Sequence, residues 1–341
     1  MNTKELLISL SNMAGVSGNE NTVSLALSEL LNTRIKTKEK IYISGGNVIV
    51  DFGQRMNKKP HVLIDAHMDE VGMIATYIDN EGFVVPGNIG GMDYRIFPAQ
   101  KVIIHGTKEI PGVVTAVPPH LSDNSDTVSG MDDIRIDTGY TKSEAEKLIP
   151  LGSVISFYSQ ARTLMSGRVA GKSLDNRAGV AAVIRMLEIL NDSSDLNCSF
   201  SILFSSAEEI GQRGAKTACF QINPDIAISV DVSFALTPDD SKSKCGILSN
   251  GPMIGISPSL SREISDLLIH TAQKQKIPYQ TEVMSGLTGT NADQFSICRS
   301  GVKSCTCSIP LRYMHTPVEV VDICDIENTA LLLAEFIMVV K

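Results

Sequence analysis

Short apolar runs alternate with helix-length segments over much of the 341-residue chain. Runs typical of buried strands lie at 41–43, 47–52, 61–65, 199–204, 226–230 and 302–309. Apolar residues recur at helical spacing at 4–14, 20–33, 180–190, 260–276 and 325–340, and residues 17–21 resemble a helix cap. Strands that alternate with helices favour an α/β fold. We expect a mostly parallel, partly mixed sheet with helices on both faces.

Residues 71–164 differ in pattern from the rest of the chain. Short β-like runs recur between Gly, Pro and Asn/Asp breaks, at 71–78, 83–85, 101–105, 112–117, 134–136 and 154–158. Helical spacing is confined to one segment at 142–148. Several short strands at this spacing predict a small barrel or sandwich. We therefore expect two domains: a discontinuous α/β domain formed by 1–70 and 165–341, and a β-rich domain inserted at 71–164.

Ionisable residues follow the ends of several separate predicted strands, and one more precedes the helix at 180–190. Because the carboxyl ends of parallel strands form one edge of an open α/β sheet, we expect these side chains to meet at that edge. The residues are His67, Asp69, Glu208, Glu209, Asp231, His315 and, before the helix, Asp175.

Two imidazoles and several carboxylates in one cleft suit a borderline divalent ion such as Zn²⁺, Co²⁺ or Mn²⁺. With a bridging carboxylate, two such ions lie about 3.5–4 Å apart and share a water whose pKa falls toward neutrality. The adjacent Glu208 and Glu209 point in different directions, so one can bind metal while the other holds a water. Taken singly, each residue also has a structural interpretation: a solvated acidic turn, a structural histidine, or a capping aspartate.

Four motifs together resemble the TET-type dinuclear metalloaminopeptidases, a family that includes glutamyl and deblocking aminopeptidases and some members labelled endoglucanase. They span 67–72, 173–177, 208–215 and 314–319, in the family's order and over nearly the whole chain. The resemblance implies a phosphorylase/aminopeptidase-like α/β fold with the insert as a small dimerisation barrel. It also implies a homo-oligomer, either a dimer or a tetrahedral dodecamer.

The same resemblance implies two divalent metal ions per subunit, zinc or cobalt, with manganese also open. Asp175 would bridge the two ions. His67 and Asp231 would complete one metal site, and Glu209 and His315 would complete the other.

Three further residues receive roles from the resemblance. Glu208 would be the general base that takes a proton from the metal-bound water during hydroxide attack and delivers it to the leaving amine. Asp69 would orient the metal-binding imidazole two residues before it. His120, in the insert, would either reach a neighbouring active site or lie on the surface as an ordinary polar residue.

A late Gly-rich loop is expected on the substrate side of the site. The N–H groups of Gly289 and Thr290 would either bind substrate or belong to a turn. Asn291 stands where the family often has Asp, and this departure bears on specificity or on the rigidity of the loop.

Composition narrows the classes of function. A net charge of -8 and no Lys/Arg-rich run argue against a nucleic-acid binder. The lack of Trp and the 5% aromatic content leave few stacking platforms for a sugar, and a glycoside hydrolase would need two carboxyls roughly 5–9.5 Å apart. No segment reaches the roughly 18 apolar residues of a membrane span, and no export signal is evident. We expect a cytoplasmic protein whose seven cysteines are reduced thiols.

The expected activity is the metal-dependent removal of N-terminal residues from peptides. A related metal-dependent carboxypeptidase or deacylase is the nearest alternative, because similar architecture serves both. An endoglucanase and a non-enzymatic assembly protein are the two other classes. Loss of activity in EDTA would distinguish the metal-dependent candidate functions from an endoglucanase.

Overall fold

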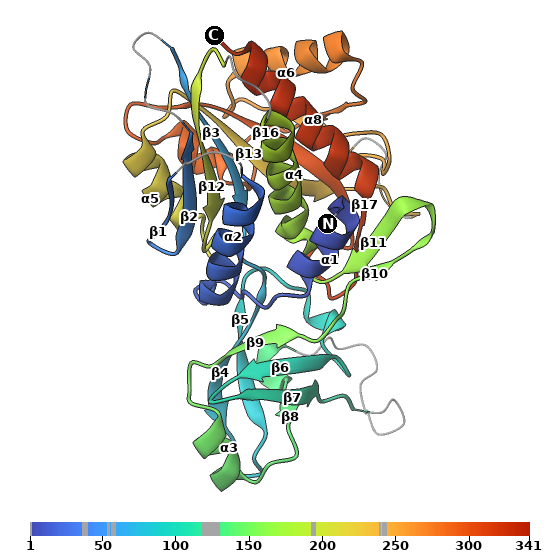
Figure 1. The fold of residues 1–341 in the computed structure, drawn as a ribbon. Coiled ribbons are helices and arrows are strands. Elements are labelled where there is room, and N and C mark those ends of the chain that lie inside the picture. The colour runs from blue at the N-terminus through green and yellow to red at the C-terminus, as the bar shows by residue number, and fades with distance from the viewer. Residues whose placement is uncertain are drawn as a thin grey trace.

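The structure is a computed structural model that describes residues 2–35, 40–52, 55, 59–117, 130–191, 196–238, 240 and 244–341. It contains an 11-stranded mixed sheet with helices on both faces and a closed barrel of six strands that projects from the edge of this layered body (Figure 1). The predicted α/β class with a mixed sheet and a small barrel is therefore confirmed, but the sheet is not mostly parallel, because most of its strand pairs are antiparallel. Among the described residues, the helices are all too short or too polar to pass through a lipid bilayer.

The large sheet has a parallel centre flanked by antiparallel strands. Its main path runs β1-β2-β12-β3-β13-β16-β17-β11-β10, with β14 and β15 joined beside β16. Strands β12, β3, β13 and β16 are parallel to their neighbours in this set, which brings their carboxyl ends to one edge. The strands are β1 (Lys40–Ser44), β2 (Asn47–Phe52), β3 (His61–His67), β10 (Arg162–Thr163), β11 (Arg168–Gly171), β12 (Ser199–Ser205), β13 (Ile226–Phe234), β14 (Met253–Ile256), β15 (Gln280–Val283), β16 (Lys303–Arg312) and β17 (Glu319–Asp322).

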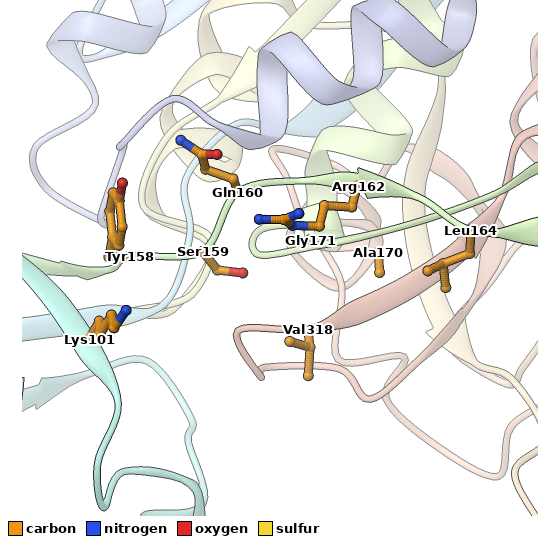
Figure 2. Close-up of a pocket in the computed structure, with 9 residues that line it drawn as sticks. All are labelled: Lys101, Tyr158, Ser159, Gln160, Arg162, Leu164, Ala170, Gly171 and Val318. Carbon is orange, nitrogen blue, oxygen red and sulfur yellow. The ribbon is translucent and has the colours of Figure 1, made fainter.

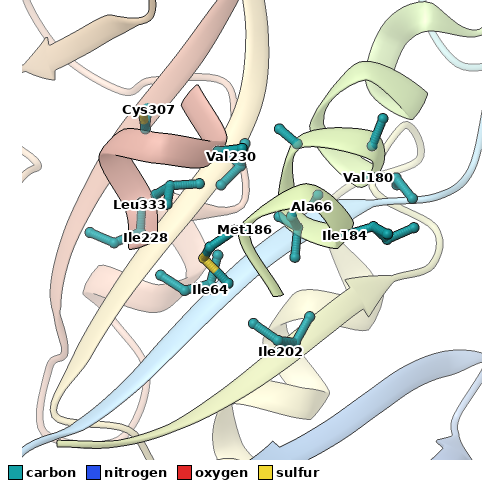
Figure 3. Close-up of a cluster of buried hydrophobic side chains, with 14 of the residues drawn as sticks. Ile64, Ala66, Val180, Ile184, Met186, Ile202, Ile228, Val230, Cys307 and Leu333 are labelled. Atoms are coloured by element: carbon teal, nitrogen blue, oxygen red, sulfur yellow. The ribbon is translucent and has the colours of Figure 1, made fainter. Parts of the chain in front are cut away.

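Alternation along the central strands assigns the two faces of the sheet. In β3, Ile64 and Ala66 face the larger helical layer, whereas Leu63 packs with residues of α5 and α7 on the opposite face. Figure 3 shows the first of these cores, in which side chains of α4 and α8 meet the central strands. The helices are α1 (Thr3–Ser11), α2 (Asn21–Arg34), α4 (Leu174–Leu190), α5 (Arg213–Ile222), α6 (Arg262–Gln275), α7 (Ala292–Ser296) and α8 (Ile323–Val339).

The barrel closes in the order β4-β5-β8-β7-β6-β9 and has an apolar core of its own. Its short helix α3 (Lys142–Leu148) begins at a capping box between Thr141 and Glu144. The barrel strands are β4 (Gly72–Ile78), β5 (Val84–Ile89), β6 (Lys101–His105), β7 (Glu109–Val114), β8 (Ile136–Asp137) and β9 (Val154–Phe157). Each lies on or beside a predicted run, because the alternating apolar residues of a small barrel face one enclosed core.

Three local predictions need correction. The N-cap of α2 is Glu20, which lies in the predicted stretch at 17–21, but its side chain makes no capping hydrogen bond to the helix. The hydroxyl of Ser17 instead donates to the Asp69 carboxylate. Helix α4 begins at Leu174, well before residue 180. Strand β13 continues to Phe234, so its acidic residue lies within the strand and not beyond its end. The sequence analysis did not predict two helices, α5 and α7, or five strands, β10, β11, β14, β15 and β17.

Candidate active site

One cavity of about 370 Å³ collects most of the predicted site residues. It opens at the carboxyl edge of the parallel strands, where β3 and β13 supply side chains directly. The others come from the loop after β12, the first turn of α4, the loop between β15 and α7, and the loop between β16 and β17. The lining includes His67, Asp175, Glu208, Glu209, Asp231, Gly289, Thr290 and His315.

Strand register explains why His67 and Asp231 lie at the same level. Ser229 of β13 pairs with Asp65 of β3, and each strand continues two residues further to its site residue. Residues two apart on a strand point to the same face. His67 and Asp231 therefore face the same cavity, with the His67 Nε2 3.5 Å from Asp231 Oδ1.

The carboxylate of Asp175 lies between the two imidazoles. Its Oδ1 is 3.1 Å from His67 Nε2, and its Oδ2 is 3.1 Å from His315 Nε2. His315 Nε2 also lies 3.4 Å from Glu209 Oε1. The donor atoms form three groups that could hold a metal ion. Two of them, His67–Asp175–Asp231 and Asp175–Glu209–His315, share the Asp175 carboxylate, and the third is His67–Glu208–Glu209.

The donor set fits divalent cations. The Nδ1–H of His315 donates to the Gly91 carbonyl, and His67 Nδ1 lies 3.4 Å from Asp69 Oδ1. Each imidazole thus turns its Nε2 toward the carboxylates, as a metal-binding histidine does. Glu209 Oε1 is buried without a hydrogen-bond donor. Within the described part of the chain, no Lys or Arg forms an ion pair with the carboxylates of the two donor groups. Two cations would supply the missing positive charge.

The pKa values of residues in the cluster also indicate that positive charge is missing from the site. Burial raises the pKa of Glu208 to about 9, and the carboxylates of Asp231 and Glu209 add to the rise. Burial alone would lower the pKa of His315, but its contacts with Asp175 and Glu209 raise it to about 11. Protons therefore bind tightly in this cluster, at the positions where a cation fits.

Asp69 holds both the imidazole of His67 and the acidic turn in place. Its carboxylate accepts hydrogen bonds from the backbone N–H of Glu208 at 3.1 Å and of Glu209 at 3.2 Å. The hydroxyl of Ser17 donates to the same carboxylate. Sequence reasoning did not find Ser17, because its partner lies 52 residues away and only the fold brings the two together.

Glu319 is a second buried residue whose place in the site was missed. Its carboxylate accepts from the backbone N–H of Asp175 at 3.0 Å and of His315 at 2.8 Å. It therefore fixes the bridging carboxylate relative to the second histidine. Glu319 is the last residue of the fourth sequence motif, and this position was the one signal in the sequence that it belongs to the site.

The Gly-rich loop lines the cavity, and its backbone N–H groups bond within the loop. The Gly289 N–H donates to Asp293 at 2.9 Å, and the Thr290 N–H to Thr288 Oγ1 at 3.2 Å. Asn291 lies beneath the loop, fully buried, where its amide donates to Asp65 and to Ser205 Oγ, both at 2.8 Å. These bonds fit the turn interpretation, and they give Asn291 a part in the rigidity of the loop.

His120 lies outside the described residues.

A second cavity of about 390 Å³ separates the barrel from the β10–β11 hairpin, with Lys101 and Arg162 in its lining (Figure 2). None of its nine lining residues is an acid or a histidine. It therefore offers no carboxylate or imidazole to bind a metal ion, and the acidic cavity is the candidate for metal-dependent catalysis.

Three comparisons relate the chain to known proteins. A family model described as M42 glutamyl aminopeptidase matches residues 46–332. The chain is 33% identical to a lysyl aminopeptidase of Pyrococcus furiosus, over 95% of this chain and 94% of that protein. An aminopeptidase structure from the archaeon Desulfurococcus kamchatkensis has a TM-score of 0.91 at 32% identity and covers 99% of this chain and 94% of its own.

The comparisons also include a protein that forms large assemblies and one with a different name. The TET1 peptidase of Pyrococcus horikoshii, which can assemble into a tetrahedron or a large octahedral shell, has a TM-score of 0.85 at 28% identity over 99% of this chain and 100% of its own. A Thermotoga maritima structure named endoglucanase has a TM-score of 0.77 at 28% identity, over 99% of this chain and 96% of its own.

Proposed function

The chain belongs to the M42 family of aminopeptidases and is a peptidase hydrolase, and from this premise we propose that it removes N-terminal residues from peptides with two divalent ions bound in the acidic cavity. One observation carries the proposal. Asp175 turns one carboxylate oxygen toward each of two histidines, at 3.1 Å from each.

The metal ligands follow from the two donor groups around this carboxylate. Asp175 would be a ligand of both ions, His67 and Asp231 would complete one site, and Glu209 and His315 would complete the other. Mixed nitrogen and oxygen donors suit zinc or cobalt, and manganese is the next choice. Such a pair of ions, when bound, polarises a carbonyl and lowers the pKa of a shared water.

Glu208 acts as the general base. It is buried and lines the cavity beside the donor groups. A carboxylate in this position can accept a proton during attack on the peptide carbonyl and return it to the leaving amine. Asp69 positions this residue through the backbone N–H of Glu208, and it orients the imidazole of His67.

The inserted barrel, residues 71–164, serves as a dimerisation domain in this proposal, and the chain works as a homo-oligomer. Support comes from the P. horikoshii TET1 peptidase, whose structure matches 99% of this chain and which can assemble into a tetrahedron or a large octahedral shell. The barrel also exposes large apolar side chains that a neighbouring subunit could cover. They include Tyr77, Val113, Val117 and Leu151.

A panel of aminoacyl p-nitroanilides and their N-acetylated forms tests the function. After EDTA treatment, we expect turnover to vanish, and added Zn²⁺ or Co²⁺ to restore it for free-amine substrates only. Cleavage of the acetylated forms after metal addition would favour a deacylase or carboxypeptidase. Activity on soluble glucan that survives EDTA would favour the endoglucanase reading.

A further inference from the structure

A carboxylate in the wall of the active-site cavity has no role in the proposed metal centre. Glu282 of β15 lines both the acidic cavity and a neighbouring cavity of about 550 Å³. The alternation of β15 turns Glu282 inward, whereas Val283 points to solvent. Its side chain is therefore available to a substrate bound beside the metal ligands.

Glu282 lacks a cationic partner. Hydroxyl groups of Ser233 and Ser308 hydrogen-bond to its carboxylate. Burial raises its pKa, and the nearby carboxylate of Asp231 adds to the rise. Among the described residues no Lys, Arg or His forms an ion pair with it, although Lys244 lines the neighbouring cavity. A largely buried carboxylate without a counter-charge is costly, and a cation supplied by a ligand would remove that cost.

The surroundings of Glu282 suit a long aliphatic chain. Three apolar side chains, Phe234, Met284 and Leu287, line the same two cavities. Phe234 and Leu287 are largely exposed at the cavity wall, where a ligand could cover them. Apolar side chains beside a carboxylate match a side chain with several methylene groups and a terminal positive charge. A shorter apolar side chain would leave the carboxylate unpaired, and an acidic side chain would be repelled.

We propose that Glu282 selects peptides whose N-terminal residue is basic, lysine or arginine, by pairing with the cationic end of that side chain. This inference rests on the proposed aminopeptidase function and deepens it. The two names among the comparisons disagree on the preferred residue, since one is lysyl and the family description is glutamyl. The carboxylate at position 282 decides between them for this chain.

Lysyl and norleucyl p-nitroanilides give the sharpest test, because norleucine has the four-carbon chain of lysine without the ammonium group. We expect the metal-loaded protein to have a kcat/KM for the lysyl substrate about 10 to 100 times that for the norleucyl substrate. Glu282→Gln keeps an acceptor for the Ser233 hydroxyl but removes the charge, and it should bring this ratio to about 1.

Glu263→Gln is the matched control, because Glu263 forms an exposed ion pair with Lys303 away from the cavity. The control should leave the ratio unchanged. An equal fall for both substrates in Glu282→Gln would overturn the proposal, since it would place Glu282 at the α-amine or in the support of the site. A wild-type preference for glutamyl or norleucyl substrates would also overturn it.

Binding of free amino acids separates this proposal from the proposed function. L-lysine should raise the melting temperature of the metal-loaded protein more than L-norleucine, and Glu282→Gln should abolish the difference. Lysine-selective binding without turnover of any free-amine substrate would refute the aminopeptidase function and support the binding of a basic side chain at Glu282. Turnover of free-amine substrates together with equal binding of lysine and norleucine would support the aminopeptidase function and refute the selection of basic residues by Glu282.

Discussion

Glu208→Gln is expected to lower kcat by about 1,000-fold while both metal ions stay bound. The amide has nearly the shape of the carboxylate but cannot take a proton during attack or return it to the leaving amine. The position of Glu208 in the wall of the acidic cavity, beside the donor groups, suits that exchange. Steady-state kinetics with the best free-amine substrate, together with metal analysis of the same sample, measures both effects.

Glu209→Gln is the informative neighbour. Glu209 belongs to the donor group with Asp175 and His315, so its amide variant should weaken metal binding as well as turnover. Comparison of the Glu208→Gln and Glu209→Gln variants would thus distinguish the residue that transfers protons from the residue that binds metal. Near-normal kcat in Glu208→Gln would rule out Glu208 as the general base.

Asp175→Ala is expected to abolish the binding of both ions, and turnover with it. The carboxylate lies in both donor groups, with one oxygen 3.1 Å from each histidine. Its loss leaves each site with one histidine and one other carboxylate, too few ligands to hold a divalent ion against water. No other single substitution in the cluster should affect both sites in this way.

Melting curves with added Co²⁺ measure this loss without relying on activity. Metal at 100 times its Kd should stabilise the wild-type protein by about 2.7 kcal/mol per site. Asp175→Ala should show no metal-dependent shift, and Asp175→Asn should show that the folded chain survives without the charge. A full shift in Asp175→Ala would contradict the bridging position.

The sequence predicted the large features because each rests on local patterns. Apolar runs with polar ends identified β3 and β12, and the parallel order of these strands placed His67 near Glu208 and Glu209. The family resemblance is confirmed by the match over residues 46–332. The barrel was visible as a change from helical spacing to short alternating runs.

The supports of the site could not be predicted, because they depend on contacts between distant segments. Ser17 looked like a helix cap and instead binds Asp69. Glu319 reaches the backbone of Asp175 across 144 residues. Glu282 lies on β15, a four-residue strand too short and too polar to be recognised from periodicity. In each case the pairing partner is set by tertiary packing.

The number of metal ions per subunit tests the central claim most directly. Calorimetric titration of the metal-stripped protein with Zn²⁺ or Co²⁺, checked by elemental analysis after dialysis, gives that number. A shared Asp175 carboxylate between two donor groups predicts two ions per subunit in the wild-type protein and none in Asp175→Ala. One ion per subunit, or full activity in the stripped protein, would contradict the dinuclear centre.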